Sequence, residues 1–206
     1  MIKNIVFDMG KVLMNFDPDA FIKWIGITDP KDAEILKREV YLSVEWAMMD
    51  RGTLTDEQAC KIMEKRVPDH LKDYIKELTY KWNEPIIPIE GAKEVIAELK
   101  QNGYKIYLLS NASLNQLNYW DKIPGSEYFD GTLVSSTIKM VKPQLEIFDY
   151  FIDKFKLKKE ECFFIDDSPH NVDAAQCCGI KGMVFHGDYK EVREKLIKNG
   201  VKIKSN

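Results

Sequence analysis

Four polar clusters in this chain carry residue types that suit chemistry on a small charged molecule. They are Asp8, Ser110-Asn111, Lys142-Pro143 and Asp166-Asp167. Asp8 directly follows the apolar residues 5–7 and precedes a loop that contains Gly10. Ligands of an open α/β sheet bind beyond the carboxyl ends of its parallel strands, so an aspartate at that position suits a nucleophile or a metal ligand. A lone aspartate after a strand is more often a turn or cap residue, so the other clusters must decide.

Each of the other clusters has a chemical interpretation beside an ordinary structural one. The Ser110 hydroxyl and the main-chain N–H groups near Asn111 suit phosphate oxygens, although both residue types also cap helices. Lys142 precedes a proline at the expected start of an amphipathic helix, close to where an anion would bind, whereas most lysines are simply solvated. Asp166 and Asp167 repel each other, and a divalent cation would relieve that repulsion, although an acidic helix start is the alternative.

The elements expected around these clusters define an α/β fold. Apolar runs predict strands at residues 3–7, 106–109, 131–134, 162–165 and 181–185, and helical patterns cover 91–101, 143–155, 169–178 and 189–198. Strands that alternate with helices are typical of a parallel sheet. We therefore predict a Rossmann-like parallel sheet core, with helices on both faces, formed by residues 1–15 and 86–206.

Residues 16–85 contain helical spacing without a convincing strand, which predicts an inserted helical cap. Thr55 and Gln58 have the spacing of a capping box, so a helix should start there. We expect this insertion to choose the substrate. Trp24, Trp46, Met48 and Met49 are its candidate pocket residues, with the alternative that they form the core of the insertion itself.

Composition excludes several classes of partner. The 206 residues are 45% hydrophobic and 31% charged with a net charge of −3, and no lysine and arginine stripe with interleaved aromatics is present. We therefore expect no nucleic-acid partner and instead a small-molecule substrate. The four cysteines have no metal-site spacing, and no apolar segment suits a signal peptide or a membrane span. A cytoplasmic protein without membrane contact is expected, and its oligomeric state is left open.

In their order and strand context, the four clusters resemble the signature segments of the haloacid dehalogenase superfamily, over nearly the whole chain. The resemblance implies a helical cap inserted after the first signature, and Mg²⁺ as cofactor. It also implies that Asp8 attacks phosphorus to form an aspartyl-phosphate, and that Lys142 neutralises charge beside it. Ser110 and the N–H of Asn111 would bind phosphoryl oxygens. The implied metal ligands are Asp8, the main-chain carbonyl of Gly10, Asp167 and Asp166, the last either directly or in the outer shell.

Gly10 departs from the family pattern. Phosphatases of the superfamily usually have a second aspartate there, as general acid and base, a role that contributes about 10²- to 10⁴-fold to the rate. Glycine cannot protonate a leaving group. Substrates whose leaving groups depart readily without protonation should therefore be preferred. Candidate substitutes are Lys11, Asp17, His170, a cap residue and metal-polarised water.

Three functions from different classes remain open. The leading one is a Mg²⁺-dependent phosphatase that hydrolyses a small phosphorylated metabolite, such as a sugar phosphate. A metal-independent 2-haloacid dehalogenase needs no acid, because halide leaves unprotonated, but the Asp166-Asp167 pair argues against it. The third is a non-catalytic protein that binds a phospho-ligand, suggested by Gly10. Halide release in EDTA would support the second function, and tight binding without hydrolysis the third.

Overall fold

The computed structural model describes residues 1–203, and its centre is a sheet of five parallel strands in the order β3-β2-β1-β4-β5. The strands are β1 (Asn4–Phe7), β2 (Lys105–Ser110), β3 (Gly131–Val134), β4 (Cys162–Asp166) and β5 (Lys181–Val184). Strand β1 lies in the middle, between β2 and β4. Connections run to opposite sides from this point, which is where open α/β sheets form their ligand crevice.

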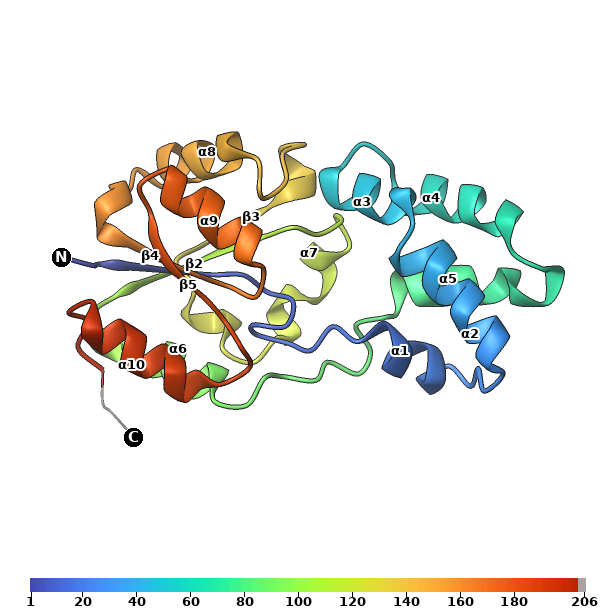
Figure 1. The fold of residues 1–206 in the computed structure, drawn as a ribbon, viewed down its shortest axis with the longest axis horizontal. Coiled ribbons are helices and arrows are strands. Elements are labelled where there is room, and N and C mark those ends of the chain that lie inside the picture. Colours follow the sequence, from blue (N-terminus) through green and yellow to red (C-terminus); the bar gives the residue numbers. More distant parts are fainter. Residues whose placement is uncertain (204–206) are drawn as a thin grey trace.

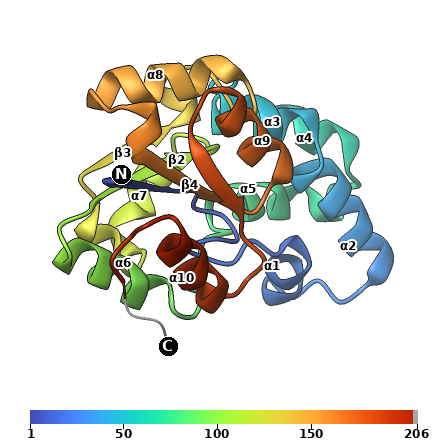
Figure 2. The same ribbon diagram turned by 60° about the vertical axis from the view of Figure 1, so that its left-hand side comes forward.

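Helices cover both faces of the sheet (Figure 2). They are α6 (Ala92–Gln101), α8 (Leu145–Phe155), α9 (Pro169–Cys177) and α10 (Tyr189–Lys198). Successive side chains of a strand point to opposite faces, and accordingly Phe7 packs in one cluster with Leu99 of α6 and Leu196 of α10. Its neighbour Val6 packs in the other cluster, with Phe148 of α8 and Ala175 of α9. The predicted Rossmann-like α/β fold is therefore confirmed.

A second group of helices lies between β1 and α6 in the chain, and beyond the carboxyl end of β1 in space (Figure 1). It consists of α1 (Pro18–Trp24), α2 (Pro30–Leu36), a π-helical turn (Lys37–Tyr41), α3 (Val44–Arg51), α4 (Asp56–Met63) and α5 (Lys72–Tyr80). We call these helices the cap. The predicted capping box is confirmed, because Thr55 and Gln58 exchange side-chain to main-chain hydrogen bonds of 3.0 and 3.1 Å. Among residues 1–203, no helix is long and apolar enough to cross a membrane.

The predicted helix start at Pro143 is wrong. Helix α8 begins at Leu145, and Gln144 before it has an extended backbone with ψ of 132°. Lys142 and Pro143 therefore belong to a loop rather than to the first turn of a helix. The lysine is positioned by contacts of that loop, and these are described with the site below.

The cap touches the core closely at the end of α3. Gly52 follows α3 with a φ of +76°, and a Cβ added there would lie 2.2 Å from the main-chain oxygen of Ser136. The Ser135 hydroxyl donates to the main-chain oxygen of Asp50 in the last turn of the same helix. Only glycine allows this approach, because it tolerates a positive φ and has no side chain to collide with the core.

We predict that Gly52→Ala weakens this contact beyond the cost of backbone strain alone. Gly26→Ala is the matched control, because Gly26 also follows a cap helix with a positive φ, of +90°, but faces open space. Alanine in the left-handed region costs about 1–2 kcal/mol. Urea unfolding should show about that loss for Gly26→Ala, and a loss larger by about 1 kcal/mol or more for Gly52→Ala, as expected for overpacking. Equal losses would contradict the contact.

Candidate active site

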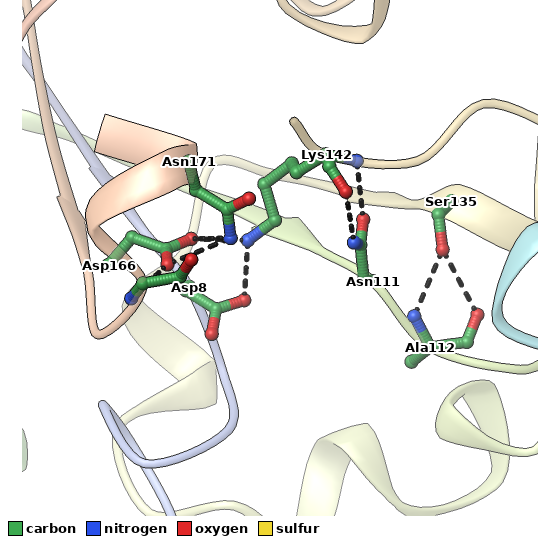
Figure 3. Close-up of polar contacts among 8 residues, drawn as sticks. Asp8, Asn111, Ala112, Ser135, Lys142, Asp166 and Asn171 are labelled. Carbon is green, nitrogen blue, oxygen red and sulfur yellow. Dashed lines mark hydrogen bonds and ion pairs between the residues drawn. The ribbon is translucent and has the colours of Figure 1, made fainter. Parts of the chain in front are cut away.

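The Lys142 ammonium is held between two carboxylates at the carboxyl ends of β1 and β4 (Figure 3). Its Nζ lies 2.7 Å from Oδ1 of Asp8 and 2.6 Å from Oδ2 of Asp166. The Lys142 side chain is 1% exposed and that of Asp166 is fully buried, whereas Asp8 keeps 12% exposure. Of the three charged groups, Asp8 is therefore the one most open to an incoming ligand.

Asp166 is saturated with hydrogen bonds. Its Oδ1 accepts from the main-chain N–H of Ser168 at 2.8 Å, and the Asn171 side-chain amide donates to both of its oxygens, at 2.9 and 3.1 Å. These donors come from the start of α9, directly after β4. With Lys142 added, both oxygens of Asp166 are engaged, so this carboxylate is arranged to fix the lysine.

Asn111 fixes the main chain of Lys142. The Asn111 side-chain amide donates to the Lys142 carbonyl, and its Oδ1 accepts from the Lys142 N–H, both at 2.8 Å (Figure 3). Within the described part of the chain, no hydrogen bond is found from the main-chain N–H of Asn111 itself. This donor is therefore available to an anion.

Electrostatics at the site favour a further positive charge. Burial raises the pKa of Asp8 above its usual value, Lys142 opposes that shift, and Asp166 adds to it. Burial alone would lower the pKa of Lys142, but the two carboxylates outweigh it and raise this pKa. The pKa of the half-buried Asp167 is also raised, first by burial and then by Asp166. The Lys142 ammonium lies between two of these three carboxylates and the Lys11 ammonium lies 4.0 Å from the third. Three carboxylates still outnumber two ammonium groups, and a divalent cation would offset the excess negative charge.

The donor set fits a hard cation. Oxygen atoms of Asp8, Asp166 and Asp167 all lie within 4.8 Å of one another. Residues 1–203 provide no hydrogen-bond donor to the main-chain carbonyl of Gly10, two residues after Asp8. Carboxylate and carbonyl oxygens are the ligands that Mg²⁺ prefers. The saturated Asp166 suits an indirect role, so Asp8, Asp167 and the Gly10 carbonyl are the better direct ligands.

A cavity of about 240 Å³ opens beside these groups. Its lining includes Asp8, Gly10, Asn111, Lys142 and Asp167 from the core, together with the aromatic side chains of Phe16, Trp46, Trp82 and Tyr119. Of the four residues expected to line a pocket, Trp46 and Met49 do so. Trp24 is instead 55% exposed, and Met48 is not among the described lining residues.

The remaining sequence candidates lie in different places. Ser110 ends β2 and is 1% exposed, and the cavity is lined by the three residues that follow it. Lys11 lines the cavity, with its Nζ 4.0 Å from Oδ2 of Asp167. Asp17 is instead the N-cap of α1, accepting from two main-chain N–H groups, and His170 is exposed on α9. Neither of these two is among the cavity residues described.

Sequence reasoning missed several lining residues, among them Phe16, Asp50, Trp82 and Tyr119. Phe16 packs at 5.2 Å, centroid to centroid, against Trp82, which in turn lies 5.6 Å from Tyr119. Helical or loop spacing does not separate such residues from ordinary core aromatics. Asp50 gave a single weak signal, as an acidic residue in the last turn of a helix, where the macrodipole disfavours negative charge.

Known proteins are similar to this chain in sequence and in fold. The family model of haloacid dehalogenase-like hydrolases matches residues 2–179. Glyceraldehyde 3-phosphate phosphatase of Methanocaldococcus jannaschii is 26% identical, over 94% of this chain and 90% of its own length. Drimenol cyclase of Aspergillus calidoustus is also 26% identical, over 90% of this chain, but the chain spans only 34% of that protein.

A solved structure provides a further comparison. A haloacid dehalogenase family enzyme of Bacteroides thetaiotaomicron, in complex with magnesium and inorganic phosphate, superposes with a TM-score of 0.66. It is 26% identical, and the match covers 93% of this chain and 99% of that one. The fold and the site define a hydrolase with a Rossmann-like core. More narrowly, the chain belongs to the haloacid dehalogenase-like hydrolases, which confirms the resemblance seen in the sequence.

We predict that Lys142→Met destabilises the protein by about 3–5 kcal/mol, because it leaves Asp8 and Asp166 buried without their cation. Lys159→Met is the control, since its ion pair with Asp149 is exposed and should be worth less than about 1 kcal/mol. Urea unfolding without metal measures both variants. Added Mg²⁺ should recover more stability in Lys142→Met than in the control. Similar losses in the two variants would refute the central role of the lysine.

Proposed function

We propose that this protein is a Mg²⁺-dependent phosphatase that hydrolyses a small phosphorylated metabolite through an aspartyl-phosphate intermediate. The observation that carries the proposal is the partly exposed Asp8 carboxylate, which lines a cavity and is held by the buried Lys142. A nucleophile needs a fixed direction of attack, and the hydrogen bond from Lys142 supplies one. Membership of a hydrolase family and similarity to a phosphatase support the same reaction.

Charge balance decides which residues act on the phosphoryl group. A carboxylate that approaches a phosphate ester meets strong repulsion, so positive groups must surround the reacting atoms. Lys142 already touches Asp8 and would contact a phosphoryl oxygen. The available N–H of Asn111 would donate to a second oxygen, and the Ser110 hydroxyl is proposed for a third. Asp8, Asp167 and the Gly10 carbonyl would hold Mg²⁺, with Asp166 behind them; the ion would supply charge neutralisation at the phosphoryl oxygens.

The cavity suggests the kind of substrate. Its volume of about 240 Å³ suits a small organic group rather than a polymer, because ligand pockets scale with the molecules they enclose. Phe16, Trp46 and Trp82 present ring faces and edges, which can pack on the C–H groups of a sugar or a short carbon chain. Thr79 lines the same cavity, and its hydroxyl donates to the main-chain oxygen of Ile75. A sugar phosphate or a similarly small phosphomonoester is the substrate class that we propose.

The proposal predicts phosphate release from a panel of small phosphomonoesters, present with Mg²⁺ and lost in EDTA. Asp8→Asn should reduce the rate at least about 1,000-fold, because the amide cannot act as the nucleophile. Asp121→Asn is the matched control, since Asp121 is exposed on the core and does not line the cavity, and it should act like wild type. Released phosphate is the quantity measured.

Two further measurements would point to the alternatives. Halide release from 2-haloacids that persists in EDTA would replace the phosphatase with a dehalogenase. Binding of phosphate esters in calorimetry, with no phosphate released over hours, would replace it with a binding protein. Equal phosphate release by wild type and Asp8→Asn would remove Asp8 from the reaction.

A further inference from the structure

Because position 10 is a glycine, the core lacks the usual carboxyl group that protonates the departing alcohol. The structure reduces the number of residues that could take over this role. Asp17 and His170 are excluded by position, because one caps α1 and the other is exposed outside the described cavity lining. Lys11 lines the cavity but is 56% exposed and lies beside Asp167. If its ammonium gave up a proton, the Asp167 carboxylate 4.0 Å away would lose its paired charge, so Lys11 is a poorer proton donor than a carboxyl group.

The cap contributes one carboxylate to the cavity. Asp50 lies in the last turn of α3, and its side chain is among the described cavity residues with Asp8, Asn111 and Ser113. The main-chain N–H of Ser113 lies close enough to stabilise the charged carboxylate of Asp50. Asp50 therefore faces the loop after β2, the same loop whose N–H groups are proposed for phosphate.

The position of Asp50 is fixed by the core. Its main-chain oxygen accepts from the Ser135 hydroxyl, which also accepts from the Ala112 N–H at 3.0 Å. The following Gly52 lets α3 end directly against Ser136. The cap residue that carries this carboxylate is thus anchored to two core loops that border the cavity. A catalytic group needs such support, because its surroundings must hold it in a fixed position.

We propose that Asp50 is the general acid and base of this enzyme, delivered by the cap in place of the residue that Gly10 lacks. This inference rests on the proposed phosphatase function. It extends that function by assigning the proton transfers to a residue of the cap.

The two half-reactions then balance. In the first, an Asp8 oxygen bonds to phosphorus, the ester P–O bond breaks, and its electron pair goes to the leaving oxygen, which takes the proton of the Asp50 carboxyl. In the second, water attacks the aspartyl-phosphate and gives a proton to the Asp50 carboxylate. The bond between phosphorus and Asp8 breaks, its electron pair returns to Asp8, and inorganic phosphate leaves with Asp50 protonated again.

The surroundings of Asp50 suit a proton donor. Burial raises the pKa of Asp50 well above its usual value, and the charge of Asp56 raises it further. The Ser113 N–H opposes this rise, and the charge of Asp8 adds a smaller increase. The Tyr119 hydroxyl shares this region, and burial together with Asp50 and Asp56 raises its pKa as well. A carboxyl group that holds its proton more strongly than usual suits acid catalysis of alcohol departure.

The test uses leaving groups of different basicity on wild type and Asp50→Asn, with Mg²⁺. The probes are p-nitrophenyl phosphate, whose phenolate leaves unprotonated, and an alkyl phosphate such as glyceraldehyde 3-phosphate. For the alkyl ester, kcat/KM should fall about 100-fold or more, whereas for p-nitrophenyl phosphate it should fall less than about fivefold. Because kcat/KM covers only the steps up to alcohol release, the second half-reaction does not enter this comparison.

A second measurement separates chemistry from a structural role. In Asp50→Asn, water attack also lacks its base, so kcat for p-nitrophenyl phosphate should fall while a burst of nitrophenol equal to the enzyme concentration appears. Asp69→Asn, at an exposed cap carboxylate, is the control and should change neither quantity. Equal losses of kcat/KM on both esters, or no loss on the alkyl ester, would overturn the proposal.

Rescue by Gly10→Asp completes the test. A Cβ at Gly10 meets only the Phe16 Cβ, at 3.9 Å, which is an ordinary van der Waals contact, so the backbone there accepts a side chain. In the Asp50→Asn background it should restore alkyl-ester kcat/KM at least about tenfold, a gain larger than any that it gives in the wild-type background. An equal gain in both backgrounds would show that Asp50 supplies no proton. Hydrolysis of p-nitrophenyl phosphate by wild type and its loss in Asp8→Asn test the phosphatase function separately.

Discussion

The sharing of one buried ammonium between two carboxylates is the interaction on which this site depends. Lys142 joins Asp8 at the end of β1 to Asp166 at the end of β4, although the lysine is 134 residues from one partner and 24 from the other. A buried charge costs several kcal/mol to desolvate unless it is paired, so none of the three groups is stable there alone. Because two negative charges share one positive charge, the cluster retains a net attraction for a further cation.

The order of the strands makes that cluster possible. Strand β1 lies between β2 and β4, so the loops after all three open at one edge of the sheet. The loop after β2 supplies Asn111, whose side chain pairs with both main-chain polar groups of Lys142. The lysine is therefore held by a partner from another strand and not by the helix that follows it. This explains why α8 can begin only at Leu145 without disturbing the site.

Much of the core could be predicted from sequence because strands buried on both faces leave continuous apolar runs. The apolar runs before Asp8 and Asp166 predicted that both carboxylates lie at strand ends. The order of the family motifs predicted that Lys142 lies beside them. The cap interior could not be predicted in the same way. Trp24 and Trp46 are alike in sequence, yet Trp24 is 55% exposed and Trp46 lines the cavity. The difference depends on how helices cross, which no local pattern records. Asp50 escaped notice for the same reason, since its partners lie on distant core loops.

If the proton donor belongs to the cap, contact between cap and core is needed for the chemical step as well as for substrate binding. With the nucleophile and the acid on one loop, an open enzyme would already contain every group that the reaction needs. With Gly10 on that loop and Asp50 on α3, the proposed reaction of an alkyl ester requires the cap to be docked at Ser135 and Ser136. With the cap docked, Phe16 and Trp82 line the cavity, where apolar rings would exclude water and strengthen the electrostatic interactions inside. A substrate too large for the cavity would hold α3 away from the core. Such a substrate would lack both the contacts with the cavity walls and the proton donor Asp50. Selectivity would then act on the chemical step in addition to binding.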